Sequence, residues 1–82
     1  PSTVEIKRMF VEPVVRGRGV ATEILAHRER IGRALGARRA VLETGVYQDD
    51  AIGLYRRAGY GQVDCWGEYA TSPTSVCYQK SI

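Results

Sequence analysis

The chain has 82 residues, 44% of them hydrophobic, and its 12 Lys and Arg against 9 Asp and Glu give a formal net charge of +3. This length holds one small domain, residues 1–82, and excludes large architectures such as a complete dinucleotide-binding domain or a TIM barrel. The apolar content excludes a disordered chain, and no apolar run reaches the roughly 18 residues of a membrane span.

The first half of the chain has the pattern of a strand, a glycine-containing loop and a helix. Residues 4–11 alternate polar and apolar side chains and then become apolar, which is typical of a strand. Residues 14–19 form the loop. Residues 20–35 repeat apolar side chains at helical spacing, and we expect this stripe to face the core. Its members are Val20, Ile24, Ile31 and Leu35, with His27 and Ala34 on the same face.

The second half predicts a strand, a helix and a hairpin. Residues 40–44 indicate a strand parallel to the first, because a helix connects the two. Residues 49–58 indicate a helix, and residues 62–66 and 75–80 indicate two antiparallel strands. The expected order is β-α-β-α-β-β. The face of the second helix that should be buried contains Ala51, Leu54, Tyr55 and Ala58.

The basic side chains are concentrated in one segment. Residues 16–39 contain seven arginines and two glutamates, a net charge of about +5, whereas the remainder carries about −2. Such a segment favours an anionic partner, which could be a phosphorylated cofactor, a nucleic acid or an acidic surface. The alternative is a solvated, arginine-rich helix face.

The two cysteines and the single histidine limit the redox and metal chemistry. Cys65 and Cys77 are too few for a disulfide scaffold, and they lack the spacing of a zinc site. We expect two reduced, partly buried thiols in a cytoplasmic protein without a metal, with a single hairpin disulfide as the alternative. His27 is interpreted as a packed helix residue.

The loop between the first strand and the first helix carries the clearest chemical signal. Gly17 and Gly19 let the backbone approach a ligand, and Arg16 and Arg18 add positive charge. The helix that follows offers unpaired N–H groups and a favourable dipole to an anion. These features predict a pyrophosphate site, with a merely tight turn as the alternative. The loop lacks the Gly-Lys-Ser/Thr of a Walker A motif.

Three motifs resemble those of the GNAT superfamily of N-acetyltransferases. Arg-Gly-Arg-Gly-Val-Ala at residues 16–21 resembles the family's Arg/Gln-x-x-Gly-x-Gly/Ala signature. Met-Phe-Val-Glu-Pro-Val-Val at residues 9–15 resembles the preceding strand and Val-x-Pro turn. Residues 48–60 resemble the Asn-x-x-Ala-x-x-Leu-Tyr-x-x-x-Gly-Phe helix, with Gln48 in place of Asn and Tyr60 in place of Phe.

The resemblance covers about residues 4–81 and implies a fold. That fold is a partial GNAT-like acyl-CoA N-acyltransferase of the α/β class, with a mixed sheet and two helices. The family's domain usually begins with three further strands and one or two helices, which form one wall of the acceptor site and are absent from these 82 residues.

The resemblance also implies roles for particular residues. The strand backbone at residues 9–11 would pair with the pantetheine arm of acetyl-CoA, and an N–H near Val11 would polarise the thioester carbonyl. The N–H groups of residues 18–22 would receive the pyrophosphate. Tyr55 matches the family's general acid, which protonates the departing thiolate; the alternative is a residue of an amphipathic stripe. The implied cofactor-binding residues are Met9, Phe10, Val11, Arg16, Gly17, Arg18, Gly19, Val20, Ala21, Thr22 and Gln48.

Other side chains are weaker candidates. Glu5, Glu12 and Glu43 lie on or beside the two parallel strands and could act as the general base, although each also fits a solvent or salt-bridge role. Trp66 and Tyr69 could line an acceptor pocket, with core packing or loop anchoring as the alternative.

The resemblance therefore predicts an enzyme that transfers an acetyl group from acetyl-CoA to a primary amine by direct attack. The alternatives are a CoA-binding or assembly module without turnover and a small basic nucleic-acid-binding domain. The last is disfavoured because no aromatic residues are interleaved with the arginines. The first strand would be an exposed edge without its usual neighbour, which predicts a homodimer or other self-association along residues 4–11.

Overall fold

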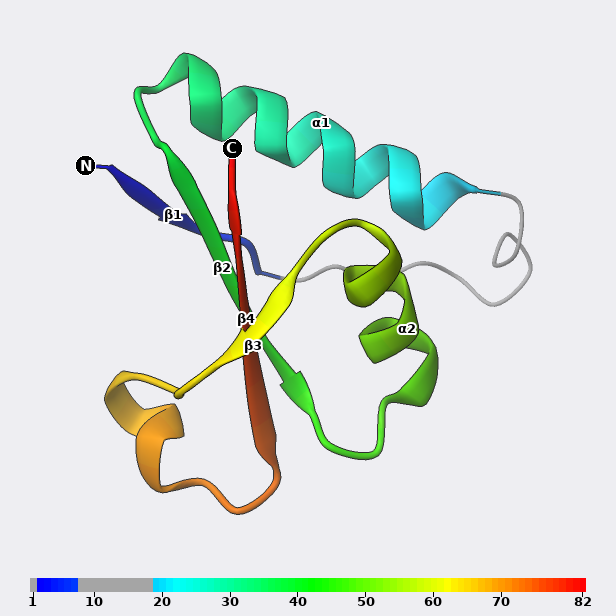
Figure 1. Ribbon diagram of the computed structural model, residues 1–82, viewed down its shortest axis with the longest axis vertical. Coiled ribbons are helices and arrows are strands. Elements are labelled where there is room, and N and C mark those ends of the chain that lie inside the picture. The colour runs from blue at the N-terminus through cyan, green and yellow to red at the C-terminus, as the bar shows by residue number, and fades with distance from the viewer. Residues whose placement is uncertain (1, 8–18) are drawn as a thin grey trace.

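The computed structural model describes residues 2–7 and 19–82, which form a four-stranded sheet, two α-helices and a short 3-10 helix (Figure 1). The predicted order of strands and helices is confirmed. The elements are β1 (Thr3–Glu5), α1 (Val20–Ala34), β2 (Arg39–Gly45), α2 (Asp49–Arg57), β3 (Gly61–Val63), η2 (Gly67–Thr71) and β4 (Ser75–Ser81).

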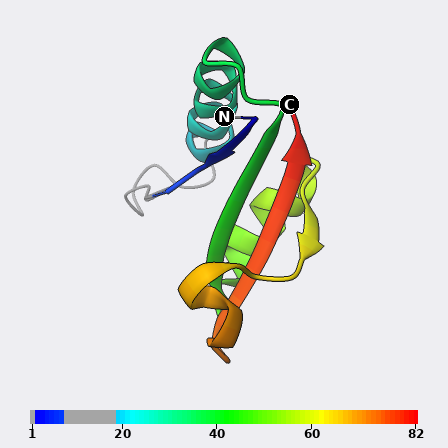
Figure 2. The same cartoon turned by 90° about the vertical axis from the view of Figure 1, so that its left-hand side faces the viewer.

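The sheet has the order β1-β2-β4-β3. β1 and β2 are parallel, as a helical crossover requires, and β4 is antiparallel to both β2 and β3. The last strand thus inserts between β2 and β3, so β1 and β3 form the two edges of the described sheet. Figure 2 shows β2 and β4 as the long central pair.

Both helices cover the same face of the sheet. Directly paired residues of antiparallel strands share a face, and Leu42 of β2 is paired with Tyr78 of β4. Tyr78 contacts Tyr55 of α2, and Lys80, two residues along β4, binds Glu29 of α1. The main core lies between the helices and this face. Its buried members are Ile6, Leu25, Ala40, Leu42, Tyr55, Tyr60 and Tyr78.

α1 has the predicted position but not the predicted orientation. Its buried residues are Leu25, Glu29 and Gly32, which lie about 120° around the helix from the apolar stripe. Ile31 and Leu35 of that stripe are 47% and 74% exposed. The expectation that the stripe faces the core is therefore wrong. The physical reason is that Gly32 permits a close approach to β1, since a Cβ there would lie 2.8 Å from Val4 Cγ1.

The prediction for His27 fails in the same way. Its side chain is exposed, so the interpretation as a packed helix residue is wrong in this structure. By contrast, the stripe of α2 is placed as predicted. Tyr55 is buried, and Ala51, Leu54 and Ala58 pack partly buried against the core.

Two strand predictions differ in length from the observed elements. The predicted strand at residues 4–11 overlaps β1, and its residues 8–11 lie outside the described part of the chain. The predicted strand at residues 62–66 is observed as β3, which ends at Val63.

The cysteines are joined rather than reduced. Cys65 and Cys77 form a disulfide with their Cα atoms 5.2 Å apart, so the alternative of a single hairpin disulfide is the one observed and the expectation of free thiols is wrong. Cys77 lies on β4 opposite Glu43, on the sheet face away from the two helices. In residues 2–7 and 19–82, no helix combines the length and apolar character needed to cross a membrane.

Candidate functional site

The N-terminal end of α1 is the described part of the predicted pyrophosphate loop. Gly19 has a φ of 77°, in the left-handed region that favours glycine, and its carbonyl accepts the Glu23 N–H at 3.1 Å. No side-chain hydrogen bond caps this turn. The backbone N–H groups of Val20, Ala21 and Thr22 therefore lie in a first helical turn whose dipole favours a negative charge.

The remainder of the predicted cofactor site lies outside the described residues. This applies to the strand that would pair with pantetheine and to the arginine-flanked part of the loop. Their roles stay predictions. The residues concerned are Met9, Phe10, Val11, Arg16, Gly17 and Arg18, and the base candidate Glu12 is a further one.

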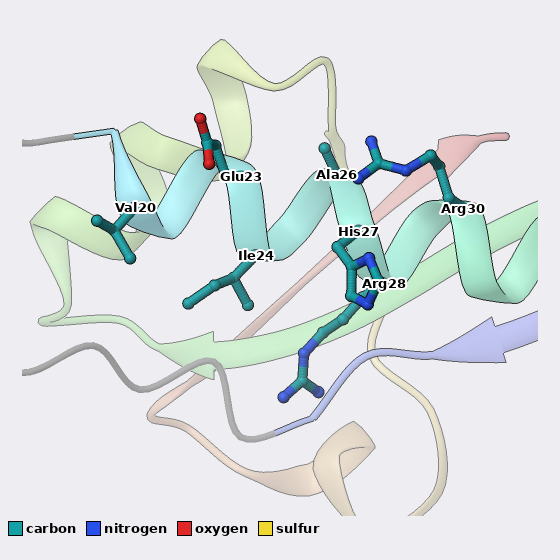
Figure 3. A pocket seen from close by; sticks show the side chains of 7 residues that line it. All are labelled: Val20, Glu23, Ile24, Ala26, His27, Arg28 and Arg30. Carbon is teal, nitrogen blue, oxygen red and sulfur yellow. The ribbon is translucent and has the colours of Figure 1, made fainter.

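The outer flank of α1 forms an open hollow of about 680 Å³. Figure 3 shows Val20, Ile24 and Arg28 projecting to one side of the helix, whereas Glu23 projects to the other. The hollow thus combines apolar surface with charges of both signs and does not have the uniform positive lining of an anion pocket. Its lining residues are Val20, Glu23, Ile24, Ala26, His27, Arg28 and Arg30.

Tyr55 is the predicted general acid, and the structure buries it. The side chain is 5% exposed, and its ring centroid lies 6.0 Å from that of Tyr60 and 6.4 Å from that of Tyr78. Burial raises the pKa of Tyr55 above its usual value, and the negative charge of Glu43 raises it further. The phenol therefore keeps its proton at neutral pH, which a general acid requires.

Glu43 is the described base candidate whose charge acts on Tyr55. It is half-buried on β2, and Ser75 Oγ donates a hydrogen bond to Glu43 Oε2 at 2.7 Å. Glu5, by contrast, forms an ion pair with Lys7 at 3.9 Å, in agreement with the salt-bridge alternative.

Gln48 is the N-cap residue of α2, and its carbonyl accepts the Ile52 N–H at 2.9 Å. Its side chain is exposed, so it is available to a ligand. Gln48 lies at the exposed start of α2, and Tyr55 lies in the buried face of the same helix. Figure 1 places α2 on the same side of the molecule as the N-terminal end of α1.

A buried polar cluster was missed by sequence reasoning. Glu29 is 6% exposed and accepts a hydrogen bond from Tyr60 Oη at 2.8 Å and another from Lys80 Nζ at 3.1 Å. The cluster joins α1 to β4 and to the residue just before β3. One feature of the sequence could have indicated this cluster. Tyr60 carries a hydroxyl at a position where the family motif has Phe.

The loop between β3 and β4 contains the two aromatic side chains for which the sequence left an acceptor pocket, core packing or loop anchoring open. Trp66 and Tyr69 pack edge to face with ring centroids 6.0 Å apart, which favours loop anchoring over an acceptor pocket. Within residues 2–7 and 19–82, no group of three or more His, Cys, Asp or Glu is arranged to hold a metal ion.

Comparison with known proteins gives consistent results. The model of the Acetyltransferase (GNAT) family matches residues 1–60. An IAA acetyltransferase from Azospirillum brasilense is 40% identical over 78 residues, which are 95% of this chain and 51% of that protein. A candidate acyl-CoA N-acyltransferase solved from Klebsiella pneumoniae is 34% identical and superposes with a TM-score of 0.92 over 98% of this chain and 55% of that one.

A third comparison concerns the fold alone. A GNAT acetyltransferase from Elizabethkingia anophelis, solved with acetyl-CoA bound, is 17% identical with a TM-score of 0.82, over 99% of this chain and 61% of that one. The predicted fold class is confirmed. The chain spans about half the length of the Azospirillum and Klebsiella proteins.

Proposed function

Because this chain belongs to the Acetyltransferase (GNAT) family, we propose that it binds acetyl-CoA and transfers the acetyl group to a primary amine. The amine nitrogen would attack the thioester carbonyl carbon directly. A C–N bond forms, the C–S bond breaks, and the amine loses one proton while the thiolate gains one. Acetyl-CoA is bound in the distant relative from Elizabethkingia anophelis, which supports it as the co-substrate.

The observation that carries this proposal is that Tyr55, at the position of the general acid in the family motif, packs in the core against Tyr60 and Tyr78. A free thiol has a pKa near 8.5 and a free phenol one near 10, and burial raises the pKa of Tyr55 further, so proton transfer from Tyr55 to the thiolate is uphill and depends on positioning. The contacts with Tyr60 and Tyr78 provide that positioning. Solvent would return the proton to Tyr55 after each turnover.

Glu43 is our proposed acceptor for the proton of the amine. It is a half-buried carboxylate on the sheet face away from the helices, and its charge raises the pKa of Tyr55, which packs on the other face. The hydrogen bond from Ser75 fixes one of its oxygens, which leaves the other to take the proton directly or through a water.

Cofactor binding is tested by thermal unfolding in the presence of acetyl-CoA, CoA or ATP. A ligand that binds the folded state alone raises the melting temperature. We expect acetyl-CoA and CoA to stabilise the chain and ATP, which has phosphates but no pantetheine, to do so much less. Equal stabilisation by all three would reduce the site to a nonspecific anion site, and no stabilisation would refute the proposal.

Catalysis is tested with Tyr55→Phe and the control Tyr47→Phe, whose side chain is 85% exposed. Loss of a general acid costs about 10²–10⁴-fold in turnover. We expect a loss of that order for Tyr55→Phe with little change in CoA affinity, and wild-type behaviour for Tyr47→Phe. If turnover and affinity fell together, Tyr55 would be a structural residue.

A second candidate is a CoA-binding module without turnover of its own. Binding of CoA without product over a broad panel of amines would select it. A nucleic-acid-binding role receives less support, because Arg28 and Arg33 already donate to the carbonyls of Lys7 and Ile82.

Three further expectations complete the proposal. Residues 1–82 form one domain, the protein works in the cytoplasm, and it forms a homodimer.

A further inference from the structure

Tyr60 is joined to Tyr55 by two contacts of different kinds. At the end of α2 the Tyr60 N–H donates to the Tyr55 carbonyl at 3.0 Å. The residue before it, Gly59, has a φ of 100°, so the chain turns back here in one of the common ways in which helices end. The turn places the two rings against each other, with 6.0 Å between their centroids. Tyr60 therefore ends the helix and forms one wall of the space that the Tyr55 ring occupies.

The second wall of this space belongs to the sheet. Tyr78 of β4 is 2% exposed, and its ring centroid lies 6.4 Å from that of Tyr55. It lies in a central strand, between β2 and β3, so the sheet fixes its position. Tyr60 lies between α2 and β3 and belongs to neither element, so the wall that it forms needs a support from elsewhere.

The hydroxyl of Tyr60 provides this support through a buried carboxylate. Tyr60 Oη donates to Glu29 Oε2 at 2.8 Å, and Lys80 Nζ donates to Glu29 Oε1 at 3.1 Å. Lys80 Nζ also lies 5.7 Å from the centroid of the Tyr60 ring. Glu29 is 6% exposed, and a buried charge of this kind is tolerated when it is paired and hydrogen-bonded. The Tyr60 side chain is thus held by the backbone at one end and by α1 at the other.

Packing alone does not require this arrangement. A phenylalanine at position 60 would fill nearly the same space against Tyr55, and a buried ion pair adds little stability over apolar residues of similar volume. A hydrogen bond to a fixed carboxylate does something that apolar packing does not. It restricts the broad ring torsion of an aromatic side chain to one orientation. The cluster therefore fixes the orientation of the wall against which Tyr55 packs.

We propose that Tyr60 is the positioning residue of Tyr55, and that Glu29 and Lys80 hold it in that role from α1 and β4. This inference rests on the proposed function, in which Tyr55 protonates the thiolate of CoA. Because that proton transfer is uphill, its rate depends on where the phenol lies relative to the sulfur. The raised pKa of Tyr55 arises from burial and from Glu43, so the cluster acts on the position of the phenol rather than on its acidity.

The kinetic test is a double-mutant cycle of Tyr60→Phe and Tyr55→Phe, each of which removes one hydroxyl and keeps the ring. We expect Tyr60→Phe to lower kcat by about tenfold while the KM for acetyl-CoA changes by less than about twofold. In the Tyr55→Phe background it should cause no further loss, because the phenol that it positions is gone. An equal loss in both backgrounds would make Tyr60 a structural residue, and no loss in either would also overturn the proposal. Tyr47→Phe, at an exposed position, is the matched control.

Variants of Glu29 test the support of Tyr60. Glu29→Gln keeps an acceptor for Tyr60 Oη and should retain most of the kcat, whereas Glu29→Ala keeps none and should behave like Tyr60→Phe. Thermal unfolding shows which variants are folded at the assay temperature. If Glu29→Ala is unfolded there, the comparison of Glu29→Gln with Tyr60→Phe decides. A Gln variant that loses as much kcat as Tyr60→Phe would contradict the hydrogen bond as the support.

A measurement without turnover separates this inference from the proposed function. The five tyrosines are labelled with ¹³C at ring Cζ, and the Tyr55 resonance is the one that Tyr55→Phe removes. We expect Tyr60→Phe to shift the Tyr55 resonance and to leave that of Tyr47 in place. An unmoved Tyr55 resonance would overturn the positioning role. If Tyr55→Phe retained full turnover while Tyr60→Phe still shifted the Tyr55 resonance, the acid role alone would fail and the hold of Tyr60 on Tyr55 would stand.

Discussion

The two helices cover one sheet face but use their sequences differently. In α2 the apolar face is the buried face, with Tyr55 in the core and Ala51 and Leu54 packed against it. In α1 the buried face contains Leu25, Glu29 and Gly32, while Ile31 and Leu35 of its apolar stripe are exposed. The difference shows that helical periodicity identifies which face of a helix is apolar, but it does not show whether that face packs against the core of the same domain.

The difference has a local cause. The buried face of α1 is held by a glycine that allows contact with β1 and by a glutamate that binds Tyr60 and Lys80. Neither residue type counts as apolar in a periodicity analysis. α1 therefore has two sides that can pack, and among residues 2–7 and 19–82 one of them packs against the sheet.

The largest expected effect comes from removing the same side chain on each side of α1. Leu25 is 1% exposed and Leu35 is 74% exposed. Leu25→Ala should lower the free energy of unfolding by about 2–5 kcal/mol through a cavity. Leu35→Ala should change it by no more than about 0.5 kcal/mol. Urea unfolding at a concentration that keeps the chain monomeric measures both, and equal losses would contradict the observed orientation of α1.

A smaller effect is expected at the polar cluster. Glu29→Ala leaves Tyr60 Oη and Lys80 Nζ without their shared acceptor, which should cost about 1–3 kcal/mol of unfolding free energy. Glu29→Gln keeps an acceptor for Tyr60 and should cost less. The control on α2 is Asp50→Ala, an exposed acid in the first turn. If Glu29→Ala were as mild as this control, the cluster would not hold α1.

The smallest effect appears at alkaline pH. Burial raises the pKa of Tyr60 far above 10, and the hydrogen bond to Glu29 and its charge raise it further. The unfolded chain therefore loses this proton first, so the stabilisation is complete below about pH 10 and is lost as the pH rises above it. The loss is about 1.4 kcal/mol per pH unit for this one group. Tyr60→Phe should make the fall in stability between pH 10 and 11 less steep, and an unchanged slope would contradict the buried, neutral phenol.

Much of the fold was predictable from the sequence because its signals were local. The strand at residues 40–44 and the helix at residues 49–58 are observed within about one residue of their predicted ends. The order of the sheet, with β4 between β2 and β3, depends on pairing between distant segments and has no local signal. The same is true of the disulfide between Cys65 and Cys77.

The candidate site was predictable where a motif carried it. Tyr55 and Gly19 came from the motifs, and the structure gives the first its burial and the second its left-handed backbone. Glu29 could not be found in this way, since its burial depends on Tyr60 and Lys80, which lie 31 and 51 residues away in the sequence.

The disulfide gives the molecule a sensitivity to its surroundings. Cys65 and Cys77 are 12 residues apart and close a loop that contains η2. A cross-link of this size removes conformational freedom from the unfolded chain and is worth about 3 kcal/mol in the chain-entropy description. In a reducing compartment this contribution disappears, which is a large share of the margin of so small a domain. Reduction of this bond would therefore lower the stability of the fold.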